Sequence, residues 1–582
     1  MRRSLALLGL AAAFAVSCGA RSGAPPAVES GASSEQPSAL SKEALDEVLH
    51  AVETVRRLPL SKPVPIDQVP QPEFRRRLKA HIAPSSEADK RLADVFDFSA
   101  SARAVPSKPL EDFIAAYYDI ERERIIMPLS APSQRDEVLA VYAHEVHHAL
   151  QHQHFPVRAT RESLTTDDAQ IAYLALIEGD AHATMGAYLG YRHGVPVARA
   201  LRRLTDLTAG VPLHHGRRLL AMQSSPHLVT FPYEEGMRFV ADLYRAGGFE
   251  LVNRAYQSPP TSTMHILHPQ RYVDGEQPLT LHLPGLAAVG EELTRGTWGE
   301  LRTIMSLATC VPLARARSIG AGWRGDAFVL GRRPDGRTAS VWWSAWASDD
   351  DAAAFADALG QRCKKPLVRA HRHGERVLVA AAVDDAAFAK LKHELAAMPI
   401  EHRAARPLAE VSIPERTPIP ERRKGRLEGE RYQSIWLGLD GSIPSGSHAE
   451  IGDDELELTV SDPQSGASGF LALYDHVPRG RSLDRLFSEL VNAARQASGF
   501  EPLDRGRERL RGALGDVIVQ RYALGALSLE LHVVPVCAET GALVWFTAAS
   551  NSAAADWLQR WRQGFAWIAD RRIPACRWLD PK

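Results

Sequence analysis

The sequence predicts a multidomain α+β protein, in which a mostly helical domain is followed by two α+β modules. The chain has 582 residues, which is longer than a domain with a single hydrophobic core normally is. Through residues 43–290 apolar side chains recur mostly at helical spacing, whereas beyond them short runs of strand type alternate with helical runs. A segment dense in Pro, Arg and Glu, residues 401–432, is typical of a linker and separates residues 291–400 from residues 433–582.

The composition is that of a globular chain, with 45% hydrophobic residues, 24% charged residues and a net charge of −1. Nucleic acid is not expected as a partner, because binding to phosphates requires an excess of basic residues. Beyond the N-terminus, no apolar run is long enough to span a membrane.

Residues 1–18 have the features of a lipoprotein signal peptide. Two arginines precede an apolar stretch, and Ala15-Val16-Ser17-Cys18 resembles a bacterial lipoprotein box, in which the lipid is attached to Cys18. The alternative is an ordinary cleaved signal peptide. We expect a lipid-anchored protein of the bacterial cell envelope, on the periplasmic face or outer membrane, with residues 19–42 as a flexible tether.

The motif His144-Glu145-Val146-His147-His148 lies in a segment with the apolar spacing of a helix. Residues four apart share one face of a helix, so His144 and His148 can bind one metal ion. Glu145 lies about 100° around the helix, where it could accept a proton from a water at the metal. The alternative is a His-rich helix face without a metal.

A zinc site requires a third protein ligand. His152 is about 12 Å along the helix from His144, too far to share an ion. His154 occupies the third-ligand position of another zinc motif, but that motif has Gly where Gln151 stands.

Glu178 is the preferred third ligand. It follows an apolar helical run within residues 167–182, where a carboxylate is costly unless it is paired or metal-bound. Asp180 or His182 could support a ligand imidazole. The alternative is that Glu178 lies on a solvated face.

Two segments resemble gluzincin-type metallopeptidases of bacteria and archaea. Residues 144–155 are similar to the family motif His-Glu-x-x-His-Ala-Leu-Gln-x-Gln-His-Phe, and residues 175–181 to Ala-Leu-x-Glu-Gly-Asp-Ala. Weaker similarity at 231–236 and 260–269 extends the resemblance to most of residues 43–350. It implies a zincin-like domain at 43–290 that uses Zn²⁺ to hydrolyse peptide bonds.

Further roles are expected around this site. His268 and Tyr272 are candidates for polar groups that face the zinc and stabilise an oxyanion, although such residues in a loop are often structural. The segment 117–127 has a strand pattern, and the resemblance implies that it holds the backbone of the substrate.

The two remaining modules carry no catalytic motif. Residues 291–400 predict a helix at 298–308, a hairpin turning at 334–336 and a helix at 352–359. Residues 433–582 alternate strands with helices at 483–497 and 554–569, and resemble the PsbP-like fold, an antiparallel sheet covered by helices. A binding or accessory role is the expectation for the C-terminal module.

If Cys18 carries the lipid, four cysteines remain. Location within one module favours the pairs Cys310 with Cys363 and Cys537 with Cys576, in an oxidising compartment.

The function predicted from the sequence is that of a zinc metallopeptidase, anchored to the cell envelope through its N-terminal lipid, that acts on a peptide or protein substrate. The competing hypothesis is a lipoprotein with a degenerate peptidase domain, which binds a partner through its C-terminal module.

Overall fold

The structure is a computed structural model, and the chain falls into two compact units, described residues 38–414 and 426–567. The residues that the structure describes are 38–81, 114–130, 135–192, 194, 196–198, 200–201, 227–283, 287–308, 311, 313–361, 368–396, 398, 400–414, 426–434, 439–451, 456–462, 464–465, 467–475, 501–508, 517–524, 527–536, 541–549 and 552–567. Helices and several sheets occur together, so the expected mixed α+β architecture of several parts is confirmed.

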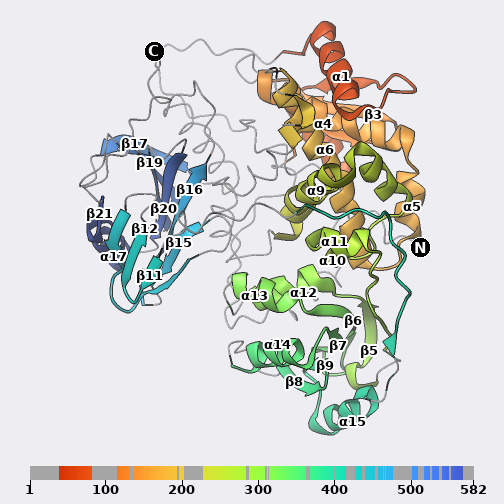
Figure 1. Ribbon diagram of the computed structural model, residues 1–582, viewed down its shortest axis with the longest axis vertical. Helices are drawn as coiled ribbons and strands as arrows, with labels where there is room; N and C mark the ends of the chain where they lie inside the picture. Colours follow the sequence, from red (N-terminus) through yellow and green to blue (C-terminus); the bar gives the residue numbers. More distant parts are fainter. Residues whose placement is uncertain are drawn as a thin grey trace. The chain divides into compact units, whose positions relative to one another are not determined.

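Four long helices build the first part of the first unit (Figure 1). They are α1 (Lys42–Arg56), α4 (Arg135–His154), α6 (Asp167–Arg192) and α9 (His227–Gln257). Helix α1 begins at Ser41, whose hydroxyl accepts a hydrogen bond from the backbone N–H of Ala44. Helix α6 is buried along most of its length, because its sequence is apolar on nearly every face.

A three-stranded sheet lies beside helix α4. Its order is β1-β3-β2, with β1 (Ile66–Val69) parallel to β3 (Arg124–Pro128) and β2 (Tyr117–Asp119) antiparallel to β3. The strand pattern expected at 117–127 is therefore a hairpin, and β2 is an edge strand among the described residues. Two shorter helices, α2 (Gln71–His81) and α5 (Val157–Ser163), complete this part.

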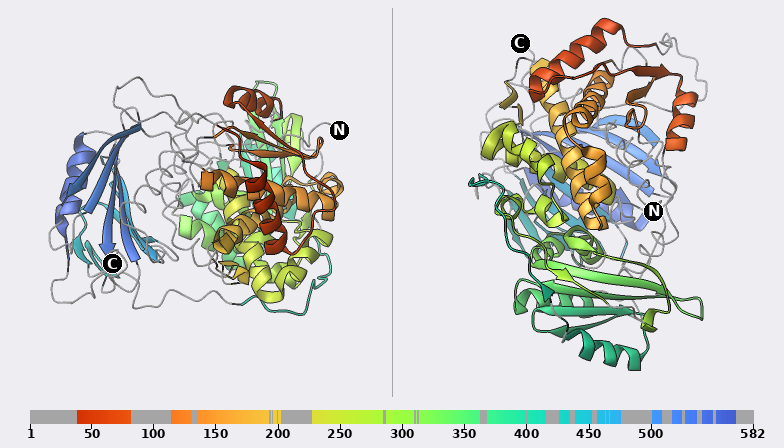
Figure 2. Two further views of the ribbon diagram at one scale, coloured as in Figure 1. Left: turned by 90° about the horizontal axis from the view of Figure 1, so that it is seen from above. Right: turned by 90° about the vertical axis from the view of Figure 1, so that its right-hand side faces the viewer.

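The rest of the first unit is built on an antiparallel five-stranded sheet, order β5-β6-β7-β9-β8 (Figure 2). Its strands are β5 (Glu291–Gly296), β6 (Trp323–Arg332), β7 (Thr338–Trp346), β8 (Val368–His373) and β9 (Arg376–Ala381). The accompanying helices are α10 (Thr263–Leu267), α11 (Pro269–Val273), α12 (Gly299–Ala308), α13 (Leu313–Gly320), α14 (Asp349–Gln361) and α15 (Asp385–Ala396). The predicted hairpin at 334–336 and both predicted helices are confirmed.

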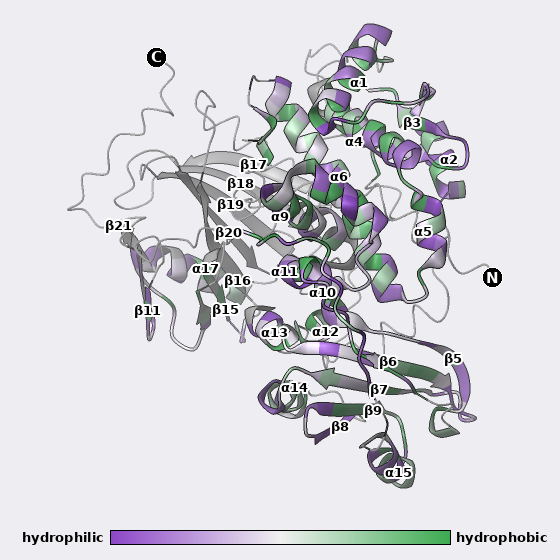
Figure 3. Ribbon diagram, turned by 45° about the vertical axis from the view of Figure 1, so that its right-hand side comes forward, coloured by the Kyte–Doolittle hydropathy of each residue, from purple (hydrophilic) through white to green (hydrophobic). Residues whose placement is uncertain are grey.

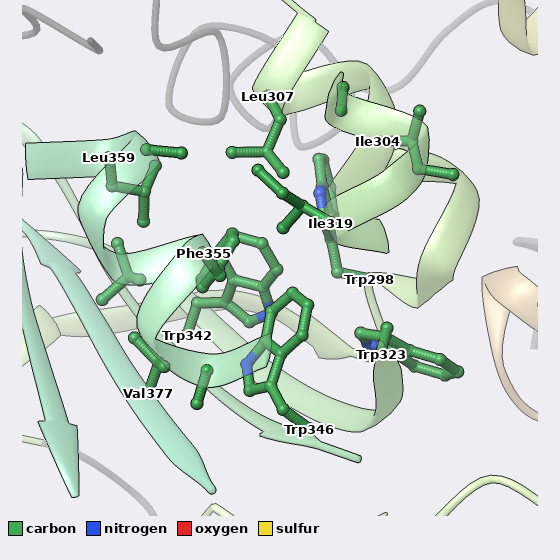
Figure 4. Packing of buried hydrophobic residues seen from close by; sticks show 14 of the residues in the cluster. Trp298, Ile304, Leu307, Ile319, Trp323, Trp342, Trp346, Phe355, Leu359 and Val377 are labelled. Carbon is green, nitrogen blue, oxygen red and sulfur yellow. The ribbon is translucent and has the colours of Figure 1, made fainter. Parts of the chain in front are cut away.

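The core of this sheet is rich in aromatic rings (Figure 4). Phe355 of α14 stacks on Trp346 of β7 with centroids 4.5 Å apart and meets Trp342 edge-on at 5.3 Å. The hydropathy of the strands agrees with this burial, since β9 is largely hydrophobic and the edge strand β8 is largely hydrophilic (Figure 3).

Residues 400–414 differ from the linker expected at 401–432. Strand β10 (Ile400–Glu401) pairs with β4 (Thr280–Leu281), and the backbone N–H groups of Arg406 and Leu408 donate to the carbonyls of Gly275 and Val273. This segment therefore belongs to the first unit, because its backbone hydrogen bonds are made there.

The second unit contains two sheets and helix α17 (Ser552–Gly564) (Figure 1). The antiparallel seven-stranded sheet has the order β14-β15-β16-β20-β19-β18-β17, and the smaller sheet has the order β11-β12-β13-β21. The larger sheet comprises β14 (His448–Glu450), β15 (Leu456–Ser461), β16 (Ser468–Asp475), β17 (Glu501–Glu508), β18 (Val517–Leu524), β19 (Leu527–Val536) and β20 (Gly541–Ala549). The smaller sheet comprises β11 (Arg426–Glu428), β12 (Arg431–Ser434), β13 (Leu439–Ser442) and β21 (Phe565–Trp567).

One predicted helix in this unit is too long. Residues 554–569 were expected to be helical, but α17 ends at Gly564 and β21 pairs antiparallel with β13. A Cβ at Gly564 would lie 2.5 Å from the carbonyl oxygen of Ser442, so glycine permits this close backbone contact. Long-range strand pairing overrides the local helical pattern here.

Several predictions lie outside the described residues: the signal peptide and Cys18, the helix at 483–497, and the four cysteines Cys310, Cys363, Cys537 and Cys576. The lipid site and the two disulfides stay predictions. Among the residues that the structure describes, no helix is both long enough and apolar enough to cross a membrane.

Candidate metal centre

Helices α4 and α6 bring three possible metal ligands together. His144 Nε2 lies 3.0 Å from His148 Nε2, and Glu178 Oε2 lies 3.3 Å from the first and 3.5 Å from the second. His144 and Glu178 are buried and His148 is nearly so. This group could hold a metal ion, and it unites the two histidines with the third ligand expected from the sequence.

The charges of this group depend on one another. Burial alone would lower the pKa of His148, but the negative charge of Glu178 outweighs burial and raises that pKa to about 9. Burial would likewise raise the pKa of Glu178, yet the charge of His148 and hydrogen bonds from both histidines hold it at about 2. Burial lowers the pKa of His144 to about 4. A metal binding here has to displace the proton of His148.

Glu145 lies on the same helix and is also buried. Burial raises the pKa of its carboxyl group to about 7, while the backbone N–H of Tyr118 on β2 stabilises the carboxylate. A carboxylate with a pKa near neutrality is suited to proton transfer at physiological pH.

Gln151 supports the ligand His148. Its Oε1 lies 2.8 Å from His148 Nδ1, and its Nε2 donates to the carbonyl of Ile177 at 2.8 Å. The sequence assigned such a supporting role to Asp180. Asp180 instead contacts His147 Nε2 at 3.1 Å. His147, which precedes the candidate ligand His148 in the chain, is therefore the imidazole that faces this carboxylate.

Helix α9 places Tyr233 near the candidate metal centre. The ring of Tyr233 lies 6.4 Å from that of His144 and 6.0 Å from that of His182, which itself lies 5.9 Å from the ring of His144. The expected residue His182 is therefore beside the centre as a ring neighbour of one ligand. The helix bends at Gly247 and Gly248, where the backbone leaves helical geometry.

Two glycines allow α6 and α9 to touch through their backbones. A Cβ at Gly179 would lie 2.1 Å from the carbonyl carbon of Gly236, and a Cβ at Gly236 would lie 2.1 Å from the carbonyl oxygen of Ala175. Gly179 directly follows Glu178, so this contact also sets the distance between the third ligand and Tyr233.

The other histidines of α4 lie away from the centre. His152 Nδ1 lies 3.0 Å from the hydroxyl of Tyr118, and the exposed His154 has its Nε2 2.6 Å from the carbonyl of Pro59. His154 therefore does not complete the ligand group, because its ring points to the loop after α1.

His268 and Tyr272 have partners that do not belong to the metal group. His268 Nε2 lies 2.8 Å from Glu300 Oε1 on α12. Tyr272 is buried and donates its hydroxyl hydrogen to the carbonyl of Ser258. The polar atoms His268 Nε2 and the hydroxyl of Tyr272 are thus bonded to Glu300 and Ser258, and their expected oxyanion-stabilising role stays a prediction.

Four residues near the centre were missed in the sequence: Arg56, Gln151, Tyr233 and Tyr256. For Arg56 there was a signal, because it continues the apolar stripe of Val48 and Val52 at i+4 spacing and so had to be buried with a partner. Tyr233 lies in the segment 231–236, whose weaker similarity to the gluzincin family implies no role for it. Nothing local distinguishes Tyr256.

Comparisons with known proteins bear on another part of the chain. Residues 287–392 match a family described as a domain of unknown function, DUF8575. The matched residues include all five strands of the sheet β5-β6-β7-β9-β8, and do not include the metal group. A comparison with curated proteins finds no match to this chain.

Proposed function

We propose that this protein is a zinc-dependent metallopeptidase of the bacterial cell envelope, built on a zincin-like helical domain. The observation that carries the proposal is the spacing of the three donor atoms, 3.0, 3.3 and 3.5 Å. Tetrahedral zinc with bonds of about 2.0–2.1 Å has neighbouring donor atoms about 3.3 Å apart.

The donor chemistry also fits zinc. Two imidazoles and one carboxylate are a common zinc ligand set that leaves one position open. Glu178 Oε2 is buried and lies 3.3 and 3.5 Å from the two imidazole nitrogens, so a cation held between the three atoms would satisfy it. A bound zinc ion would act as a Lewis acid on a carbonyl and lower the pKa of a bound water to about 7.

Glu145 supplies the proton transfer in this proposal. It lies beside the two histidines on α4 without belonging to the ligand group, and its raised pKa allows it to accept a proton near neutral pH and pass it to the leaving amine. The N–H of Tyr118 holds the carboxylate in place.

Strand β2 is the proposed place for the substrate backbone. Strand β2 pairs with β3 on one side only among the described residues, and the backbone N–H of Tyr118 on this strand bonds the carboxylate of Glu145. A peptide that added to this edge as a further strand would run past Glu145.

The test is a peptide-library digest by the purified full-length protein and its Glu145→Gln variant. Glutamine keeps the size of the side chain but cannot accept a proton at neutral pH, so turnover should fall by about 10²–10⁴ while zinc content stays the same. Glu162→Gln on α5, an exposed residue, is the matched control and should change neither. Full activity of Glu145→Gln, or loss of its zinc, contradicts the assigned role. A zinc-loaded wild type that cleaves nothing favours a binding lipoprotein.

A further inference from the structure

We infer that Gln151 is a positioning residue that fixes which nitrogen of His148 faces the metal, and that Arg56, Asp180 and Tyr256 fix the orientation of Gln151. The inference rests on the proposed zinc centre and deepens it. Its basis is a buried series of hydrogen bonds whose directions follow from the chemistry of each group.

The series begins at Arg56 on α1, which is fully buried. Its Nε donates to Asp180 at 3.0 and 3.2 Å and its Nη2 donates at 3.0 Å. Asn253 accepts from the same Nη2 at 2.7 Å, and the guanidinium lies 4.5 Å from the ring centre of Phe249. Arginine can only donate, so both carboxylate oxygens of Asp180 accept hydrogen bonds from Arg56. Asp180 is therefore an acceptor in this series.

The acceptor role of Asp180 determines the direction of the hydrogen bond that the hydroxyl of Tyr256 on α9 makes with it. Both oxygens of Asp180 accept from Arg56, so Tyr256 is the donor in its contact with Asp180 Oδ2 at 2.9 Å. The oxygen of Tyr256 then accepts from Gln151 Nε2 at 2.8 Å.

Gln151 has no freedom to flip its amide. Its Nε2 donates both to Tyr256 and to the carbonyl of Ile177, and a carbonyl can only accept. The Oε1 of Gln151 must consequently face His148, where it accepts from Nδ1–H at 2.8 Å. With the proton on Nδ1, the lone pair of Nε2 is directed to His144 and Glu178, where the metal would bind.

The same side chain connects two ligands. Gln151 lies one helical turn beyond His148, and the carbonyl that it binds belongs to the residue immediately before Glu178. Removing it should therefore loosen both the ring orientation of His148 and the register of α4 against α6.

The experiment measures zinc affinity of the purified full-length protein by competition with a chelator. Gln151→Met keeps the length of the side chain and loses both kinds of hydrogen bond, so zinc affinity should fall about 10–100-fold, the usual effect of losing such a support. Gln153→Met is the matched control on the same helix, since Gln153 bonds the backbone of Ser61 and Lys62 and not a ligand. Its zinc affinity should equal that of the wild type.

A spectroscopic readout separates positioning from general stability. In the zinc-loaded wild type, the Nδ1–H of His148 should give a slowly exchanging downfield imidazole proton in NMR spectra. Gln151→Met should lose this signal, and Gln151→Glu, which keeps an acceptor at the same place, should retain it even if Gln151→Met folds poorly. If the wild type binds zinc and Gln151→Met binds it as tightly, or if Gln151→Glu loses the signal, this inference is overturned while the zinc centre stands. A wild type that binds no zinc overturns both.

Discussion

Glu178 is a buried carboxylate whose Oε2 lies 3.3 and 3.5 Å from the ring nitrogens of His144 and His148, and it is the proposed third ligand. Substituting Glu178 by Ala should reduce zinc affinity more than the roughly 10–100-fold expected for a supporting residue, because two histidines leave the ion under-coordinated. Metal analysis after dialysis measures this.

His154→Ala is the control for that substitution. His154 occupies the alternative third-ligand position in the sequence but contacts the Pro59 carbonyl at the surface, so this variant should keep stoichiometric zinc. The reverse pattern, with zinc kept by Glu178→Ala and lost by His154→Ala, would show that the wrong third ligand has been assigned.

At the scale of elements, the crossing of α6 and α9 depends on a backbone contact at Gly179 and Gly236. Gly179→Ala should lower the free energy of unfolding by about 1–3 kcal/mol, because the new methyl group forces the helices apart. Zinc affinity should fall as well, since Glu178 moves with the helix.

Gly360→Ala provides a control of opposite sign. Gly360 lies in α14 and a Cβ there meets nothing within 4 Å, so alanine should raise the free energy of unfolding by about 0.5–1 kcal/mol through helix propensity. Urea unfolding compares the two variants. Equal effects of the two substitutions would mean that the crossing at Gly179 tolerates a side chain.

A second element-scale prediction concerns Asp168, at the start of α6. It accepts from the backbone N–H and hydroxyl of Thr263 on α10, and the hydroxyl of Thr263 in turn accepts from the N–H of Leu301 on α12. Burial raises the pKa of Asp168 from 3.8 to about 6, against the hydrogen bonds from Thr263 and Ser262 that stabilise its charge.

A carboxyl group with a raised pKa binds more protons in the folded than in the unfolded state. The free energy of unfolding that Asp168 contributes is therefore highest below about pH 4 and falls by about 3 kcal/mol as pH rises to about 6. Asp168→Asn, measured by urea unfolding at several pH values, should remove this part of the slope. Asp167→Asn, its exposed neighbour, should leave the slope as it is. An unchanged slope in Asp168→Asn would count against a raised pKa of Asp168.

For the whole molecule, the proposal depends on where the chain resides. Cys18→Ala should release the protein from the membrane fraction of the producing bacterium, because the acyl chains that would be lost supply about 0.8 kcal/mol per buried CH₂. Fractionation followed by immunoblotting measures this, with Cys310→Ala as a control that should stay membrane-bound. Membrane association of Cys18→Ala equal to that of the wild type would contradict a lipid anchor.

Local periodicity in the sequence was sufficient to predict much of this protein. The apolar stripes of α1, α4 and α6 and the alternation in β15, β18, β19 and β20 repeat over short distances, and these elements formed as expected. The i, i+4 spacing of His144 and His148 places both on one helix face by geometry alone. The carboxylate of Glu178 in an apolar run was a visible reason to look for a partner.

Only the tertiary structure decided which groups meet across elements. His268 contacts Glu300 of α12, and Tyr256, which follows the bend of α9 at Gly247 and Gly248, contacts Gln151 of α4. Residues Ile400 and Glu401 pair with β4 of the first unit, and the residues after Gly564 form a strand that pairs with β13. In both places the partner strand offers backbone N–H and C=O groups for hydrogen bonds. Such contacts depend on how helices and strands cross, and the crossing is set by side-chain size and backbone approach at distant positions. A period read along one segment contains no information about that approach.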